Sequence, residues 1–155
     1  MRMLKRTALV FALLLVSALI MSCGASQKVT VNVTVTVIIP DLDDVYFGPV
    51  TVPVEGKADD PPTILRCVKE AFILNDMKYE TDESEVGEFS ITSIGDYKEK
   101  TEGDYTYFWD YTLNGEEPKS GRAGTIIANE GDVIVYTYYQ VLTEELASKD
   151  TLKNH

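Results

Sequence analysis

The chain has 155 residues and a formal net charge of −11, with 25 acidic residues against 14 basic ones. An acidic surface repels phosphate backbones and anionic lipid headgroups, which argues against nucleic-acid binding. The only histidine is the terminal His155, and no Ser–His, Cys–His or phosphate-cradling glycine motif is present. The sequence therefore predicts a protein that is not an enzyme and has no cofactor or metal site of recognised spacing.

The first 22 residues have the pattern of an export signal. A basic start from Arg2 to Arg6 precedes an apolar run over residues 7–21. This run is too short to span a membrane comfortably, since a spanning helix needs about 20 apolar residues. It closes at Ser22-Cys23, which resembles the lipobox of bacterial lipoproteins. The resemblance implies cleavage before Cys23 and lipid attachment to its thiol, with an ordinary secretory signal as the alternative.

Export would leave a lipid-anchored, extracytoplasmic chain on the bacterial cell surface or the periplasmic face. The leader, residues 1–22, carries three basic and no acidic residues, so the exported chain is more acidic still. We divide this chain into a lipidated tether (residues 23–28), one folded domain (29–142) and a polar tail (143–155). With Cys23 used for lipid, Cys67 has no partner for a disulfide.

Two strands are predicted at the start of the domain. Lys28–Ile39 alternates valine with polar residues, which is typical of a half-buried strand. Val45–Val54 carries Gly48 and two prolines, so we expect it at the edge of a sheet. The two strands would form a hairpin.

One helix is predicted over Thr63–Asn75. Its apolar residues recur at helical spacing and include Cys67, so the helix buries one face. Because no base lies nearby in the sequence, we interpret Cys67 as a buried, inert thiol. Acidic pairs such as Asp59-Asp60 offer oxygen ligands for calcium, yet without the spacing of a recognised loop we interpret them as solvated carboxylates.

The second half of the domain is predicted to be mainly strands. The expected elements are a loop (Asp76–Glu88), a strand (Phe89–Gly95), a charged turn (Asp96–Asp104) and two final strands (Tyr105–Leu113 and Val133–Tyr139). This order predicts an α+β domain in which one helix packs across a mixed sheet. The apolar faces predict a shared core of Val33, Val35, Ile64, Val68, Phe72, Ile91 and Ile134.

The last two strands carry the only tryptophan and most of the tyrosines. Alternation places Trp109 and Tyr111 on one strand face and Phe108 on the other. We favour a core position for Trp109. Exposed rings, with Phe108, Tyr136 and Tyr138 as candidates, would instead stack on a ligand or partner.

Several short motifs in this order resemble the transcobalamin-like C-terminal domain family, a β-grasp-like module found in cobalamin carriers and in bacterial surface proteins. They are Pro62-Thr63-Ile64-Leu65, Ile91-Thr92-Ser93-Ile94, Trp109-x-Tyr111-x-x-Asn114-Gly115, Gly121-x-Ala123-Gly124 and Gly131-Asp132-Val133-Ile134. The resemblance spans roughly Val29 to Tyr139. It implies a β-grasp-like mixed sheet with one packed helix.

The resemblance also implies a ligand site at the last two strands and the loop between them. The residues that it points to are Phe108, Trp109, Tyr111, Asn114, Gly121 and Gly124. Cobalamin carriers enclose their ligand between this module and a helical barrel. The sequence shows no such barrel, so cobalamin or another small molecule would need a partner protein as the second wall. The alternative is a structural or adhesion module that pairs through Val45–Val54.

Overall fold

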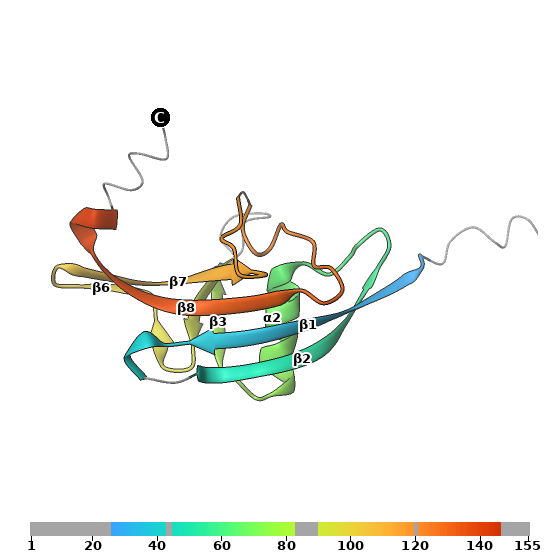
Figure 1. Ribbon diagram of the computed structural model, residues 1–155, viewed down its shortest axis with the longest axis horizontal. Coiled ribbons are helices and arrows are strands. Elements are labelled where there is room, and N and C mark those ends of the chain that lie inside the picture. Colours follow the sequence, from blue (N-terminus) through green and yellow to red (C-terminus); the bar gives the residue numbers. More distant parts are fainter. Residues whose placement is uncertain (1–25, 43–44, 83–89, 120, 147–155) are drawn as a thin grey trace, which may run out of the picture.

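The computed structural model describes residues 26–42, 45–82, 90–119 and 121–146, which form two sheets and one main helix (Figure 1). The larger sheet has the strand order β2-β1-β8-β7-β6, and the smaller one has the order β3-β4-β5. The elements are β1 (Lys28–Ile38), the short 3-10 helix η1 (Pro40–Leu42), β2 (Val45–Lys57), α2 (Ile64–Leu74), β3 (Tyr79–Asp82), β4 (Ser90–Ile94), β5 (Tyr97–Lys98), β6 (Lys100–Glu102), β7 (Tyr105–Leu113) and β8 (Val133–Leu142). The predicted α+β fold is confirmed.

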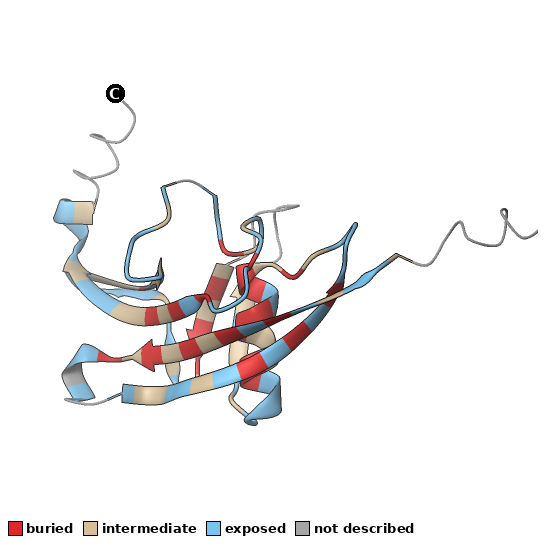
Figure 2. Cartoon of the chain, turned by 45° about the vertical axis from the view of Figure 1, so that its right-hand side comes forward, coloured by how far each residue is buried: buried red, intermediate tan, exposed pale blue. Residues whose placement is uncertain are grey.

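The valine-rich strand β1 lies inside the larger sheet. It pairs antiparallel with β2 on one side and parallel with β8 on the other, so the sheet is mixed, as predicted. Buried positions alternate with exposed or intermediate ones along β1 and along the second half of β2 (Figure 2), and the valines of β1 point into the core. β2 lies at the edge, where its prolines are tolerated.

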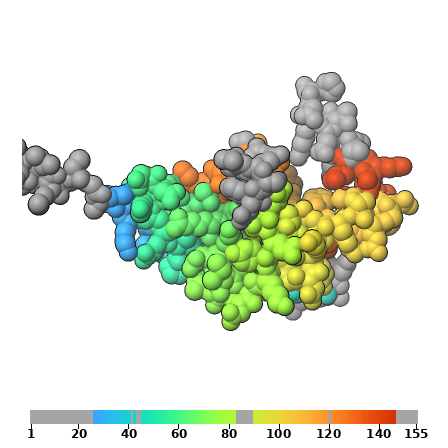
Figure 3. Space-filling model, turned by 180° about the vertical axis from the view of Figure 1, so that it is seen from behind, coloured from blue at the N-terminus to red at the C-terminus, as the bar shows by residue number. Residues whose placement is uncertain are grey.

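The helix α2 packs behind this sheet. Thr63 caps its start, where the hydroxyl accepts a hydrogen bond from the Arg66 backbone N–H at 3.3 Å. Phe72 is fully buried, and its ring lies 5.5 Å from that of Phe47 on β2 and 5.6 Å from that of Tyr79 on β3. From behind, the helix lies beside the residues of the smaller sheet (Figure 3). The helix therefore joins the two sheets into one core.

Every residue of the predicted core is confirmed as buried. Ile91 is 1% exposed and the others are 0% exposed: Val33, Val35, Ile64, Val68, Phe72 and Ile134. Cys67 is also buried, as predicted. Burial raises the pKa of its thiol to about 12, with a smaller contribution from the Asp132 carboxylate, so the thiol stays protonated at neutral pH.

Two sequence predictions, a loop and a turn, are wrong because short strands lie in both segments. The expected loop Asp76–Glu88 contains β3, in which Tyr79 pairs with Ile94 of β4. The expected turn Asp96–Asp104 contains β5 and β6. These strands are too short for an alternating pattern to stand out. Tyr79 of β3 and Tyr97 of β5 pack against rings from other elements, and β6 pairs with β7 of the larger sheet.

The remaining predictions concern the two ends of the chain: the leader with its lipid site, and the end of the last strand. β8 continues three residues beyond the predicted strand end at Tyr139, and residues 143–146 that follow are helical. No described helix has the length and apolar content that crossing a membrane requires. The leader, Cys23 and Phe89 lie outside the described residues.

Candidate functional site

The inner face of the β7–β8 pair is part of the core. Trp109 is 7% exposed, and its indole N–H donates to the Tyr97 carbonyl oxygen at 3.0 Å. The favoured core position of Trp109 is confirmed. Tyr111 stacks on Tyr136 with ring centroids 5.2 Å apart, and Tyr136 is 2% exposed. Tyr136 is therefore also a core residue rather than an exposed ring.

The Tyr111 hydroxyl is buried without a hydrogen-bond partner among the described residues. Burial raises the pKa of Tyr111 to about 12, and the neighbouring Asp110 carboxylate adds to the rise. Burial also raises the pKa of Tyr136. Both phenols therefore stay protonated at neutral pH, and neither supplies a negative charge for catalysis.

The outer face of the same strands carries a separate aromatic pair. Phe108 stacks on Tyr139 across the two strands, with ring centroids 5.6 Å apart and an interplanar angle of 28°. Tyr139 is 40% exposed. The structure thus places Phe108 on the opposite side of the sheet from Trp109 and Tyr111, so these three predicted site residues do not share one surface.

Asn114 closes the turn at the end of β7. It has a positive φ of 55°, and its backbone N–H donates to the Val133 carbonyl oxygen at 2.8 Å. Its side-chain oxygen accepts from the Val133 N–H at 2.9 Å, and its amide N–H donates to Asp132 Oδ1 at 2.9 Å. Asp132 is 5% exposed and also accepts from the Asn129 N–H at 2.8 Å. Asn114 therefore holds the two strands and the turn together.

The loop with Gly121 and Gly124 is attached to the start of α2. The Leu65 N–H donates to the Ala123 carbonyl oxygen at 2.8 Å, and the Ile64 N–H donates to that of Ile126 at 2.9 Å. These bonds satisfy N–H groups that a helix leaves free at its first turn. Gly121 has a φ of +83°, and a Cβ there would lie 2.9 Å from the Thr125 hydroxyl oxygen. This capping role was not predicted, because the sequence does not show which carbonyls approach the helix.

A shallow hollow of about 470 Å³ lies next to this turn. We call it the loop hollow. It is lined by Leu113, Glu116, Glu117, Pro118, Lys119 and Ile126. None of the six predicted ligand-binding residues lines it, although Leu113 immediately precedes Asn114. An open surface therefore lies in the region predicted to bind a ligand, but residues next to the predicted ones line it.

A second hollow, of about 360 Å³, lies at the other end of the β7–β8 pair. We call it the tyrosine hollow. It is lined by Ile39, Pro40, Tyr105, Tyr107, Tyr138, Tyr139 and Gln140. This hollow was not predicted from the sequence. The available signal was the repetition of tyrosine at the start of one strand and the end of the next, which an antiparallel pair brings to the same end.

Two of the tyrosine rings in this hollow are fixed by other contacts. Tyr107 stacks on Tyr138 with centroids 6.0 Å apart, and the Tyr138 hydroxyl donates to the Lys98 carbonyl oxygen at 2.6 Å. Partial burial raises the pKa of Tyr138. The Lys100 ammonium lies 5.0 Å from the centroid of the Tyr107 ring. The tyrosine rings are therefore held in place, and one already receives a cation.

The described residues contain no group of three or more His, Cys, Asp or Glu side chains placed to hold a metal ion. Lysines and glutamates instead pair on the surface. Examples are Lys98 with Glu80 at 2.6 Å and Lys28 with Glu55 at 3.3 Å. Such exposed pairs contribute little to stability, and their main effect is on the charge of the surface.

Comparisons with known proteins place this geometry in context. Residues 63–140 match the model of a domain of unknown function, DUF4430. The fold is similar to part of haptocorrin in a crystal structure with Cbi, with a TM-score of 0.56 and 18% identity, covering 77% of this chain and 27% of haptocorrin. A crystal structure of a candidate metal-binding protein from Ruminococcus gnavus ATCC 29149 gives a TM-score of 0.42 and 19% identity. That match covers 72% of this chain and 98% of the Ruminococcus protein. No curated protein sequence matches significantly.

Proposed function

Because this chain belongs to the DUF4430 family and shares its fold with part of haptocorrin, we propose that it is a non-catalytic binding module outside the cytoplasm. Lipid on Cys23 anchors it, and the loop hollow supplies one wall of a ligand site. The ligand class is a flat corrinoid such as cobalamin, since the haptocorrin structure is a complex with Cbi. A partner protein supplies the second wall.

The observation that carries this proposal is the rigid support of the loop hollow. The loop that contributes Ile126 is bonded to the helix start through Ile64 and Leu65, and the strand that contributes Leu113 is closed by Asn114. A surface fixed in this way loses little conformational entropy when a ligand binds. Leu113, Pro118 and Ile126 offer an apolar face, bordered by charged side chains.

A second wall is needed because the aromatic rings nearby are not available. Trp109 lies in the core and Tyr111 stacks on Tyr136, so neither can cover a corrinoid. Ligand pockets usually bury roughly 70–90% of the surface of a ligand, whereas an open hollow covers only one side of it. This chain spans 27% of haptocorrin, so the similarity covers only part of that protein. Binding by the chain alone should therefore be weak.

Titration of the full-length chain in detergent with cobalamin tests the proposal. The corrinoid absorbs in the emission range of tryptophan, so binding should quench Trp109 fluorescence at millimolar ligand. Ile126→Ala should weaken that quenching, while Ile127→Ala, a matched change at a neighbouring residue that is 54% exposed, should leave it unchanged. Quenching that is equal in both variants would exclude the loop hollow. No quenching after inner-filter correction would remove corrinoid binding by the chain alone.

Anchoring is tested separately. Cys23→Ala should abolish labelling by a clickable fatty acid and release the protein from the membrane fraction. Cys67→Ala is the matched control, because Cys67 is buried and should not take up lipid. Labelling that persists in Cys23→Ala would contradict the lipoprotein assignment.

An adhesion module that pairs through a sheet edge is the second candidate, and the position of β2 favours it. β2 is an edge strand that runs over Val45–Lys57 beside a closed aromatic core. If this edge pairs with an envelope protein, Thr51→Lys should reduce co-purification of that protein, because charge on an edge strand opposes pairing. An unchanged co-purification would remove the candidate.

A further inference from the structure

Among the described residues, the strand β8 has one unpaired edge beyond its contact with β1. β1 pairs with β8 only from Thr34↔Val133 to Ile38↔Thr137, while β8 continues to Leu142. After Ile38 the chain turns away through η1 (Figure 1). In the described part of the chain, no strand pairs with this side of β8 from Tyr138 onward.

The direction of the backbone groups on this edge follows from the bonds further back. The Thr34 N–H donates to the Asp132 carbonyl oxygen, whereas Val133 bonds to Asn114 on the opposite side. Backbone groups alternate in direction along a strand, so the even-numbered residues of β8 face β1. The Tyr138 carbonyl, both backbone groups of Gln140 and the Leu142 N–H therefore face the open side. Unpaired groups of this kind are a template for another strand.

The tyrosine hollow lies beside the same edge. Gln140 and Leu142 are exposed, and Tyr105 is 42% exposed. Tyr107 and Tyr138 share the inner strand face with Gln140, opposite Tyr107 in the register. A strand added at the edge would send alternate side chains toward these rings, because side chains alternate between faces.

The tyrosine rings of the hollow and the net charge of the chain favour a basic segment. The Tyr107 ring already receives the Lys100 ammonium, which is a cation–π contact. Lys100 is also paired with Glu102 at 2.5 Å, and Lys98 with Glu80, so the nearby lysines are partly neutralised. The chain as a whole carries a formal net charge of −11. A positively charged segment is attracted to such a surface, while a second copy of this chain is repelled.

We propose that the open edge of β8 binds an extended, basic segment of a partner protein by strand addition, with lysine or arginine side chains of that segment in the tyrosine hollow. Backbone hydrogen bonds to Gln140 and Leu142 provide affinity. The tyrosine rings provide specificity for alternate side chains. This site is separate from the loop hollow and stands whether or not the loop hollow binds a corrinoid.

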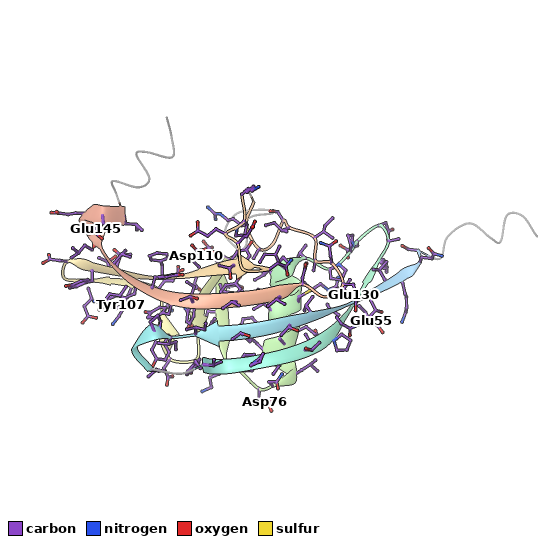
Figure 4. The ribbon with its side chains drawn as sticks, viewed as in Figure 1. Glu55, Asp76, Tyr107, Asp110, Glu130 and Glu145 are labelled. Carbon is purple, nitrogen blue, oxygen red and sulfur yellow. The ribbon has the colours of Figure 1, made fainter. Side chains whose placement is uncertain are left out.

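The position of the edge suits a protein partner. β1 starts at Lys28 and leads to Ile39, which lines the hollow; a strand of this length spans about 35 Å. Figure 4 shows Tyr107 and Glu145 at one end of the molecule and Glu55 and Glu130 at the other, near the start of β1. A chain anchored through its N-terminus therefore presents the edge on the side away from the anchor.

Hydrogen exchange with a defined peptide tests the proposal on the full-length chain in detergent. The probe is a blocked seven-residue peptide of alternating threonine and lysine. At millimolar peptide, the Gln140 and Leu142 amides should exchange at least tenfold more slowly. A glutamate version should give less protection, and a version N-methylated on its pairing edge should give none, because it cannot form the ladder. No protection of either amide by the lysine peptide would overturn the proposal.

Variants separate the backbone contribution from that of the side chains. Gln140→Ala keeps the N–H and should retain protection of Leu142, whereas Gln140→Pro removes the N–H and should lose it. An equal effect of the two would overturn strand addition. Tyr107→Leu should weaken binding of the lysine peptide about tenfold. This variant still tests the proposal if Gln140→Pro fails to fold. A concentration-dependent dimer that protects the same amides would assign the edge to a second copy and overturn the proposal.

Discussion

The two ends of the β7–β8 pair differ in how their polar and aromatic groups are used. At the loop end, the Asn114 and Asp132 side chains are engaged with each other and with the backbone of the turn. At the other end, Tyr105, Tyr139 and Leu142 are 40–42% exposed, and one edge of the strand is open. At one end of these two strands the side chains therefore bond to the turn, and at the other end exposed rings lie beside an unpaired strand edge.

This difference shows that residue type alone does not locate a binding surface. Asn114 and Gly121 are types often found at ligand sites, yet here they set the backbone of a turn and of a loop that caps a helix. Tyr107 and Tyr138 are types often found in cores, and they line a hollow. If the two ends differ in stability as well as in exposure, substitutions at each end should change the free energy of unfolding by different amounts.

The largest effect should come from the core that supports both ends. Phe72→Ala should lower the free energy of unfolding by about 3–5 kcal/mol, because the ring is fully buried against Phe47 and Tyr79. Urea unfolding measures this loss. Ile73→Ala, at a neighbouring position that is 57% exposed, is the control and should change stability by about 0.5 kcal/mol or less. A cost near zero for Phe72→Ala would mean that α2 does not dock on the sheet.

The loop end should be next in sensitivity. Asp132→Ala should cost about 2–3 kcal/mol, because it removes a buried carboxylate and leaves the Asn114 amide and the Asn129 N–H without their acceptor. A double-mutant cycle with Asn114→Ala should show coupling of about 1 kcal/mol. Additive effects of the two changes would indicate that the contact between Asn114 and Asp132 contributes nothing to the stability of the loop end.

The fold was largely predictable, because the alternation of apolar and polar residues in long strands such as β1 and β8 indicates which face of each strand is buried. The helix α2 followed from apolar spacing in the same way. The short strands were not predictable, since β5 has two residues and β6 has three. β5 is supported by tertiary contacts of Tyr97, and β6 pairs with β7 of the larger sheet. The candidate sites were predicted only to the level of the strands. Which ring is buried depends on what covers each face, and that is a property of the assembled layers.

Alkaline pH should weaken the core before it affects the open end. The pKa of the Cys67 thiol rises to about 12 in the fold from an ordinary value of 9.0, and that of Tyr111 to about 12 from 10.0. Above pH 9 the unfolded chain therefore binds fewer protons than the folded one, so stability falls as pH rises. The loss should be about 1 kcal/mol by pH 10 from Cys67.

Urea unfolding at pH 8, 9 and 10 measures this dependence. Cys67→Ala should flatten the change between pH 9 and 10, since the thiol is the group that titrates first in the unfolded chain. A pH dependence that is identical in this variant and the parent would contradict burial of the thiol as its cause.

The smallest effect on stability should come from the open end, where Tyr105→Ala should change the free energy of unfolding by about 0.5 kcal/mol or less. Tyr105 is 42% exposed, so little apolar area is lost when its ring is removed. The same change removes one wall of the tyrosine hollow, so protection of the Gln140 amide by the lysine peptide should fall severalfold. A large loss of stability with unchanged peptide protection would contradict this expectation. Tyr105 would then support the fold, as Asp132 does at the loop end.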